Sequence, residues 1–514
     1  MKALLVYPEF PDTYWSFRHA LPFYGKKSAF PPLGLLTVAA MLPREWERRL
    51  VDLNVRPLED AEIAWADMVF LSAMLVQKDS LHEVVRRCQA LGKRVVLGGP
   101  YVTTSAGEVP LADHIFIGEA ETTLPEFIDD LARGAAKRVY QPPERPALSL
   151  TPPPEFQLID AGAYYAMSVQ FSRGCPFQCE FCDIIEIYGR KPRTKSNAQM
   201  LTELDALERL GWRGLVFIVD DNFIGNKPNV KKLLPELAAW SERRQYPFSF
   251  ITEASVNLAE DEELLAGMQR AGFSHVFLGI ETPVEETLKE AQKNQNTRRN
   301  LLDSVRKIQD YGMEVMAGFI VGFDNDPADI FERQIRFIED SAIPMAMVGI
   351  LTALPETQLS RRLQREGRLL TESTGNNTDG TLNFIPRMDA GRLLAGYRQI
   401  MRTLYDPRNY YRRALSSLAR TGLKTPVPLH RDFLHDALAF ARLLLTLGLR
   451  DAARREFWRY FYRALLDHPQ HFATAMRLAA IGYHLRKLTE SEAPRLPASG
   501  RTSLSTAREL PAAS

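Results

Sequence analysis

Three of the four cysteines of the chain stand close together in the stretch FSRGCPFQCEFCDII, residues 171–185. They are Cys175, Cys179 and Cys182, with the spacing C-x3-C-x2-C. Thiolates gathered on one short loop are typical ligands of an iron-sulfur cluster. A cubane held by three thiolates keeps its fourth iron free for a ligand from outside the protein. The spacing therefore predicts a [4Fe-4S] cluster with one open coordination position.

Two other interpretations of these cysteines fit less well. Disulfide pairing would leave one thiol over and is typical of exported proteins. A structural zinc site needs a fourth Cys or His close by, which the residues after Cys182 do not supply. The remaining cysteine, Cys88, stands alone in an Arg-rich stretch with a helical pattern, and we expect it to be an ordinary helix residue.

The residues around the cysteines carry a family resemblance. Ser172-Arg173-Gly174 precede the first cysteine, and the aromatic Phe181 precedes the last one. Together with the cysteine spacing they resemble the signature of the radical S-adenosylmethionine superfamily. The resemblance implies that the open iron binds the amino and carboxylate groups of S-adenosylmethionine. It also implies reductive cleavage to methionine and a 5′-deoxyadenosyl radical, which takes hydrogen from an unactivated C–H bond.

Strands and amphipathic helices alternate on both sides of this motif. We expect strands at 167–171, 214–219, 248–252, 276–280, 315–320 and 347–351. Six such βα units predict a partial (β/α)6 TIM-type barrel, whose chemistry is carried by the loops that follow the strands.

Polar and small residues follow those expected strands. Each acidic residue has a second interpretation as a helix N-cap or first-turn charge, but their repetition after successive strands favours a site. The superfamily resemblance implies that Asp221 and Asn222 lie near the methionine part of S-adenosylmethionine, Glu253 and Glu281 near its ribose, and Gly318 to Gly322 near its adenine. Pro355, just after the sixth strand, is assigned to the same cofactor.

The first 140 residues predict a doubly wound, Rossmann-like α/β domain. Short apolar runs at 3–7, 49–53, 68–72, 94–97 and 114–117 alternate with helical patterns, an order typical of a parallel sheet. Small residues lie where these strands end or in the loops between elements, so a flat ligand can approach the backbone. The candidate contacts are Pro32, Ser72, Gly98, Gly99, Pro100, Gly118 and Glu119.

Flavin, nucleotide and cobalamin fit such loops equally, although the absence of G-x-G-x-x-G weakens the dinucleotide interpretation. The order PPLGL, SAM, LGGP, IGEAE resembles the cobalamin-binding domain that precedes many radical S-adenosylmethionine cores. A D-x-H-x-x-G motif is absent, so either cobalt has no protein histidine beneath it, as in several relatives of this arrangement, or the domain has lost the cofactor. The glycine loops that remain favour the first alternative.

Length and composition limit the remaining possibilities. A chain of 514 residues predicts two or three domains, and 64 basic against 63 acidic side chains give no reason to expect a nucleic-acid partner. The apolar run at 3–7 is too short for a signal peptide, and no apolar stretch approaches the roughly 20 residues that span a bilayer. Few cysteines and an oxygen-sensitive cluster lead us to expect a cytoplasmic protein.

The domain boundaries follow from composition. We predict a cobalamin-binding domain at 1–140, a Pro-rich linker at 141–154, the radical barrel at 155–366, a helical domain at 367–488 and a disordered tail at 489–514. The expected C-terminal helices are 390–404, 409–419, 430–447, 450–466 and 472–488. Their leucines and aromatics among arginines predict either a small domain that buries one face or a peripheral contact with a membrane or a greasy substrate.

This layout resembles a group that includes hopanoid methylases and bacteriochlorophyll side-chain methylases. The resemblance implies a cobalamin-dependent radical methyltransferase, in which a substrate radical takes a methyl group from methylcobalamin. The expected substrate is a hydrophobic small molecule, lipid or tetrapyrrole-like, methylated at an sp3 carbon, and the expected electron donor is a flavodoxin or ferredoxin. Oxidative cyclisation or ring rearrangement without methyl transfer is the alternative. A non-enzymatic cobalamin-binding regulator is disfavoured by the intact cysteine triad.

Overall fold

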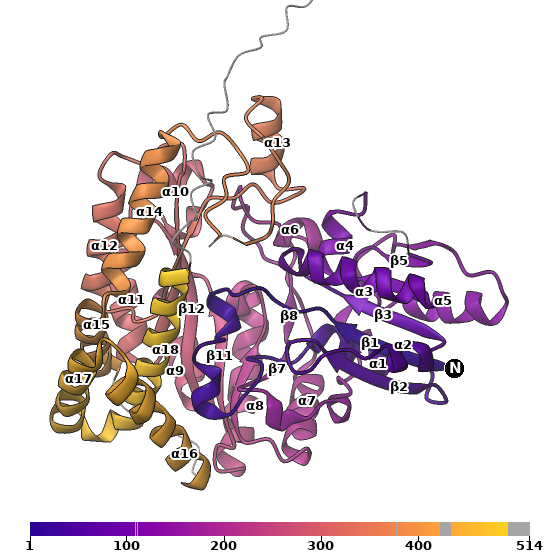
Figure 1. Ribbon diagram of the computed structural model, residues 1–514, viewed down its shortest axis with the longest axis horizontal. Helices are drawn as coiled ribbons and strands as arrows, with labels where there is room; N and C mark the ends of the chain where they lie inside the picture. The colour runs from indigo at the N-terminus through magenta and orange to yellow at the C-terminus, as the bar shows by residue number, and fades with distance from the viewer. Residues whose placement is uncertain (108, 110–111, 377–378, 422–432, 492–514) are drawn as a thin grey trace, which may run out of the picture.

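The computed structural model describes residues 1–107, 109, 112–376, 379–421 and 433–491. Two parallel sheets with their helices lie side by side, and a layer of helices covers the far side of the second sheet (Figure 1). The α/β class predicted from the sequence is confirmed in both sheets.

The first sheet is built from six parallel strands. They are β1 (Lys2–Tyr7), β2 (Glu47–Asp52), β3 (Met68–Ser72), β4 (Arg94–Gly98), β5 (His114–Phe116) and β6 (Val139–Tyr140), in the order β2-β1-β3-β4-β5-β6. The strand order reverses at β1, which makes its carboxyl end the place where such sheets bind ligands. The sequence predicted five of these strands and missed the short β6.

Helices cover both faces of this sheet. They are α1 (Leu33–Met41), α2 (Asp60–Trp65), α3 (Lys78–Ala90), α4 (Pro100–Thr104) and α5 (Thr123–Ala132). Alternate residues of β1 point to opposite faces, so Leu4 and Val6 join one core while Ala3 and Leu5 join the other. Cys88 lies in α3, as predicted, and its side chain is buried.

The second sheet is the partial barrel. Its parallel strands are β7 (Met167–Val169), β10 (Gly214–Ile218), β11 (Phe248–Ala254), β12 (Phe273–Glu281), β13 (Glu314–Val321) and β14 (Ala346–Ile350), in the order β14-β13-β12-β11-β10-β7. The larger helices between them are α7 (Asn197–Arg209), α8 (Lys227–Arg243), α9 (Glu262–Ala271), α11 (Leu301–Asp310) and α12 (Ile330–Ser341), and shorter ones are α6 (Ile184–Ile187), α10 (Glu285–Glu290) and α13 (Gln358–Arg365).

The C-terminal region is helical, as expected. Its elements are α14 (Ala390–Tyr405), α15 (Pro407–Thr421), α16 (Phe433–Leu443), a π-helix η10 (Leu444–Arg450), α17 (Arg454–Asp467) and α18 (Phe472–Ser491). The predicted helix 430–447 instead begins, in the described part, at Phe433 and continues as the π-helix to Arg450. The predicted tail at 489–514 begins too early, because α18 runs to Ser491, and the rest of that prediction lies outside the described residues.

Residues 8–32, between β1 and α1, leave the first sheet and pack under the barrel. Tyr14 donates its hydroxyl hydrogen bond to the carbonyl of Val348 at 2.8 Å, and the Trp15 ring stacks on Phe217 with 6.0 Å between centroids. The same segment lies beside β11 and α18 in Figure 1, where it is drawn in indigo. The sequence did not predict that this segment packs against the barrel. Because of this packing, the boundary at residue 140 does not separate two independent bodies.

Candidate active site

The cysteine loop leaves and re-enters the fold through a two-stranded antiparallel pair, β8 (Ser172–Arg173) and β9 (Arg193–Thr194). Asp220, at the end of β10, holds the start of the loop. Its carboxylate accepts hydrogen bonds from the Phe171 amide at 2.8 Å and the Ser172 hydroxyl at 2.6 Å. Burial raises the pKa of Asp220 to about 6, although both hydrogen bonds favour the carboxylate.

Gly174, directly before the first cysteine, is required by the shape of the loop. It has a φ of +97°, and a Cβ there would lie 2.8 Å from the Gly189 carbonyl oxygen. The next amide, that of Cys175, donates to this same carbonyl at 3.2 Å. The two ends of the loop therefore approach each other more closely than any side chain would allow.

Two of the three thiols receive side-chain N–H donors. The Asn222 amide points at Cys175 Sγ at 3.9 Å, and Gln295 Nε2 donates to Cys179 Sγ at 3.4 Å. Asn222 is itself held by the Ser255 amide, which donates to its Oδ1 at 3.1 Å. Hydrogen bonds of this kind stabilise thiolates and tune the potential of an iron-sulfur cluster.

Within the described ranges no three His, Cys, Asp or Glu side chains converge closely enough to bind a single metal ion. A cubane takes one thiolate on each of its irons, so its ligands need not converge on one ion. The loop, with three free thiols and N–H donors aimed at two of them, has the donor set that this cluster needs.

The predicted carboxylates gather at the carboxyl end of the barrel. Burial raises the pKa of Asp221 to about 7, and the neighbouring Asp220 raises it further. Burial also raises the pKa of Glu253 to about 8, with contributions from the charges of Asp221 and Glu281. The charges of these neighbouring acids therefore repel one another, and a cationic or hydroxyl-bearing ligand would relieve this repulsion.

Lys293 brings a buried cation into this group, and the sequence did not single it out. Its Nζ donates to Glu281 Oε1 at 2.6 Å and lies 5.8 Å from the centre of the Phe181 ring. The Glu281 carboxylate outweighs the effect of burial and raises the pKa of Lys293, with further contributions from Cys179 and Cys182. Lys293 therefore stays charged beside the cysteine loop.

Glycines occupy two strand positions beside this ion pair. A Cβ on Gly279 would lie 2.5 Å from Glu281 Oε1 and 2.6 Å from Lys293 Nζ, so a larger residue there would displace the ends of these two side chains. Gly318, predicted to face adenine, lies next to Glu281 on the neighbouring strand, with 3.9 Å from a built Cβ to Glu281 Oε2. Glycine at inward strand positions marks places where another group comes close.

The other two predicted S-adenosylmethionine contacts lie further along the same edge. Gly322 has a φ of +105° and its amide donates to Asp326 Oδ2 at 2.7 Å, while its Cα faces Leu393 of α14. Pro355 is in the turn between β14 and α13, and Arg362 of α13 binds Glu180 of the cysteine loop at 2.6 Å. The roles assigned to both residues stay predictions.

The loops predicted to bind cobalamin lie together at the carboxyl edge of the first sheet. Gly99 has a φ of +95°, and a Cβ there would lie 2.4 Å from Ser72 Oγ and 3.0 Å from the Ala73 amide. The Gly118 amide donates to Thr103 Oγ1 at 3.0 Å. Gly98 ends β4, Pro100 begins α4, and Pro32 is the N-cap residue directly before α1. Gly99 thus lets the start of α4 pack closely on the end of β3, and the contacts of these residues with cobalamin stay predictions.

Glu119 lies at the seam between the two sheets. Its two oxygens bind Arg193 Nη2 at 2.6 Å and Arg173 Nη1 at 2.7 Å, and Glu121 Oε1 binds Arg173 at 2.7 Å. These arginines flank the cysteine loop, so the ion pairs join it to the first domain. Both of its oxygens are already bound by arginines, and the contact of Glu119 with cobalamin stays a prediction.

The basic residues after the cysteines divide into two kinds. Arg193 is in the seam, and Lys195 forms a buried ion pair with Glu203. Arg190 and Lys191 are exposed.

Comparisons with known proteins identify the domains. The Radical SAM superfamily matches residues 169–338, the B12 binding domain matches 27–128, and a domain of unknown function, DUF4070, matches 357–496. The first two families confirm the predicted cofactors: the [4Fe-4S] cluster, S-adenosylmethionine and cobalamin.

Solved structures show the same fold. A cobalamin-dependent S-adenosylmethionine radical enzyme, OxsB, superposes with a TM-score of 0.60 at 15% identity over 96% of this chain and 80% of that one. The radical S-adenosylmethionine methyltransferase TsrM from Kitasatospora setae gives 0.59 at 16% identity over 95% and 99% of the two chains.

Sequence relatives carry the similarity further. An uncharacterized methyltransferase of Synechocystis sp. is 47% identical over 95% of this chain and 92% of its own length. The hopanoid C-2 methylase of Rhodopseudomonas palustris is 36% identical over 90% of this chain and 89% of its own length. The protein therefore belongs to the cobalamin-dependent radical S-adenosylmethionine methylases.

Proposed function

We propose that this methylase acts on an sp3 carbon of a polycyclic lipid of the hopanoid type. The similarity to the hopanoid C-2 methylase, which extends over nine-tenths of the chain, carries this substrate class. A bacteriochlorophyllide d C-12(1)-methyltransferase is 25% identical over 63% of the chain, which supports a tetrapyrrole less well.

The cysteine loop supplies the ligands in this proposal. Cys175, Cys179 and Cys182 bind the cluster, while Asn222 and Gln295 donate hydrogen bonds to the first two thiolates. The bound cofactors supply C–S bond cleavage, hydrogen abstraction and the methyl group. The polypeptide holds the cluster next to the first domain through Arg173, Arg193 and Glu119.

The carboxylates position S-adenosylmethionine. Asp221 accepts from its ammonium group, and Glu253 and Glu281 accept from its ribose hydroxyls, which offsets the repulsion between these buried acids. Lys293 fixes the Glu281 carboxylate through their 2.6 Å ion pair. Gly318, beside Glu281, leaves room for adenine against the backbone.

Methyl transfer is separated from cyclisation by isotope labelling. An anaerobic magnesium-protoporphyrin IX monomethyl ester cyclase is similar over only 38% of this chain, at 26% identity. Reconstituted protein, given S-adenosylmethionine with a deuterated methyl group, should label a hopanoid and leave a bacteriochlorophyllide unlabelled. Labelling of the bacteriochlorophyllide alone would overturn the proposed substrate class.

Cysteine variants test the cluster ligands. Cys179→Ala should lose the cluster and 5′-deoxyadenosine formation together, because only two thiolates remain. Cys88→Ala, which changes a buried cysteine of α3, is the matched control and should keep both. Retained radical chemistry in Cys179→Ala would contradict the assignment.

Two groups of exposed side chains support a lipid substrate and an acidic electron donor. No helix of the described residues is long and apolar enough to cross a bilayer. Exposed leucines on α16, η10 and α17, namely Leu434, Leu438, Leu445, Leu449, Leu465 and Leu466, support a peripheral membrane contact. The exposed Arg190 and Lys191 near the cluster support docking of a flavodoxin or ferredoxin.

A further inference from the structure

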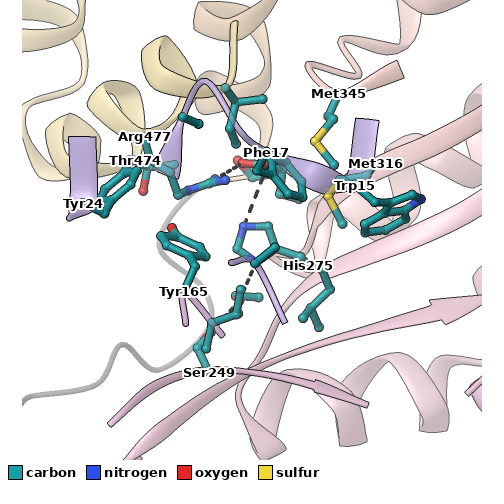
Figure 2. Close-up of a pocket in the computed structure, with 18 of the residues that line it drawn as sticks. Trp15, Phe17, Tyr24, Tyr165, Ser249, His275, Met316, Met345, Thr474 and Arg477 are labelled. Atoms are coloured by element: carbon teal, nitrogen blue, oxygen red, sulfur yellow. Dashed lines mark hydrogen bonds and ion pairs between the residues drawn. The ribbon is translucent and has the colours of Figure 1, made fainter. Parts of the chain in front are cut away.

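A cavity of about 330 Å³ lies at the amino-terminal end of the barrel strands, opposite the cysteine loop. Residues within the first three positions of four strands line it: Leu215 of β10, Ser249 of β11, His275 of β12 and Glu314 of β13. Its volume falls in the range of small-molecule sites, roughly 300–1,000 Å³. Figure 2 shows the side chains that surround it.

An aromatic layer separates this cavity from the cofactor end. On β11, Ser249 lines the cavity, and Glu253 is four residues further along the same face, which corresponds to about 13 Å. Phe217 and Phe277 occupy inward positions between the two ends, and the Trp15 ring lies 6.0 Å from the first and 5.3 Å from the second. A molecule in the cavity is therefore out of reach of the cofactors.

The walls are mainly apolar and come from all three parts of the chain. Phe17 and Tyr24 come from the segment that leaves the first sheet, and Thr474 and Ile481 come from α18. Met316 and Met345 complete the side toward β13 and β14 (Figure 2). Methionine and aromatic walls adapt to the shape of a lipophilic molecule.

One polar group in this wall lacks a partner. Arg477 Nη2 binds Glu314 Oε2 at 2.5 Å, while Glu314 Oε1 is buried and has no hydrogen-bond donor among the described residues. Glu314 is only 5% exposed, and His275 Nε2 lies 4.0 Å from Oε1, too far for a hydrogen bond. A buried acceptor of this kind is costly unless a donor reaches it.

The charges around the cavity balance. Burial lowers the pKa of His275 to about 4, and the Arg477 charge adds to this effect, so the imidazole is neutral at pH 7. The Arg477–Glu314 pair carries no net charge. A charged ligand would add an uncompensated charge to an apolar cavity, whereas a neutral hydroxyl would satisfy Glu314.

We propose that this cavity is a second binding site, for a neutral lipophile that carries a hydroxyl group. The hydroxyl donates to Glu314 Oε1, and the apolar body contacts Trp15, Met316 and Met345. The proposal goes beyond the methylation reaction and does not depend on the substrate of the cofactor end.

Bromine-labelled probes test the site in the full-length protein. 10-Bromodecan-1-ol should quench part of the tryptophan fluorescence saturably, since bromine quenches a nearby ring and Trp15 lines the cavity. 1-Bromodecane, which lacks the hydroxyl, should bind about tenfold more weakly, equal to about 1.4 kcal/mol. Equal binding of the two probes would overturn the role of Glu314.

Cavity variants and crystallography complete the test. Thr474→Phe, which fills the cavity, should weaken the alcohol at least tenfold, while the matched control Thr474→Ser should bind as wild type does. Anomalous scattering from bromine in soaked wild-type crystals should locate the probe beside Trp15, and this measurement decides even if Thr474→Phe does not fold. Bromine found only on the exposed leucines of α16 and α17, or unchanged binding in Thr474→Phe, would refute the site.

Discussion

Glu119→Gln separates two roles that this residue could have, an ion pair between the domains and a contact with cobalamin. The substitution keeps the shape of the side chain and removes its charge. Arg193 would lose its carboxylate partner and keep only the carbonyl oxygens of Pro146, at 2.6 Å, and Tyr188, at 3.2 Å. Arg173 would keep Glu121 at 2.7 Å.

The expected cost follows from burial. The side chains of Glu119, Arg173 and Arg193 are 3%, 12% and 15% exposed, so solvent screens the ion pairs weakly. Removing one partner of a buried pair costs about 3–5 kcal/mol. Because Arg173 keeps a second carboxylate, we expect the lower end, about 3 kcal/mol, which corresponds to roughly 100-fold in an opening equilibrium.

Hydrogen exchange of the cofactor-free protein measures this opening locally. Amides in residues 171–195 should exchange about 100-fold faster in Glu119→Gln. Glu126→Gln is the matched control, because it removes only an exposed ion pair with Lys137. The two side chains are 47% and 57% exposed, and exposed pairs of this kind contribute little to stability. Unchanged exchange in this segment together with lost cobalamin binding would refute the ion-pair role and favour a cofactor contact.

Three further predictions address the cluster, the acids and the surface. Gln295→Leu removes the N–H donor to Cys179, a hydrogen bond worth about 1 kcal/mol. The substitution should lower the reduction potential of the cluster by about 40 mV in an EPR-monitored titration. An unchanged potential would contradict the contact. The raised pKa of Glu253 means that, without cofactors, the stability that this group contributes is fully retained below pH 4.5 and falls as the pH rises toward 8. The melting temperature of Glu253→Gln should therefore fall less over that pH range than the melting temperature of wild type. Replacing Leu438, Leu449 and Leu466 by Ser should abolish sedimentation with anionic liposomes, and undiminished binding would exclude that face.

Local periodicity was sufficient to predict most of the fold. Apolar runs of strand length gave β3 with both ends correct, and the barrel strands to within a few residues. The two-residue strands β6, β8 and β9 were missed because so short a segment has no period to detect. The cysteine loop was predictable because three chemically distinctive residues are close in sequence.

Residues that reach the site from irregular segments were not predictable in this way. Lys293 and Gln295 lie in the polar stretch after α10, where nothing distinguishes them from surface residues. One signal existed: Gly279 is a glycine inside a strand, and the space it leaves is taken by Lys293. Trp15 lies within the predicted first domain, and its place against the barrel was not predictable, because its contacts with Phe217 and Phe277 span more than two hundred residues.

The same long-range contacts explain how two cofactors on two sheets are held in one geometry. A proline-rich connector alone leaves the distance between domains variable. Here residues 8–32 pass under the barrel, and Glu119 binds both arginines that flank the cysteine loop. The cobalamin edge of the first sheet is thus tied at one end by packing and at the other by buried charge. A radical that must meet its methyl donor before it meets solvent requires such a fixed approach.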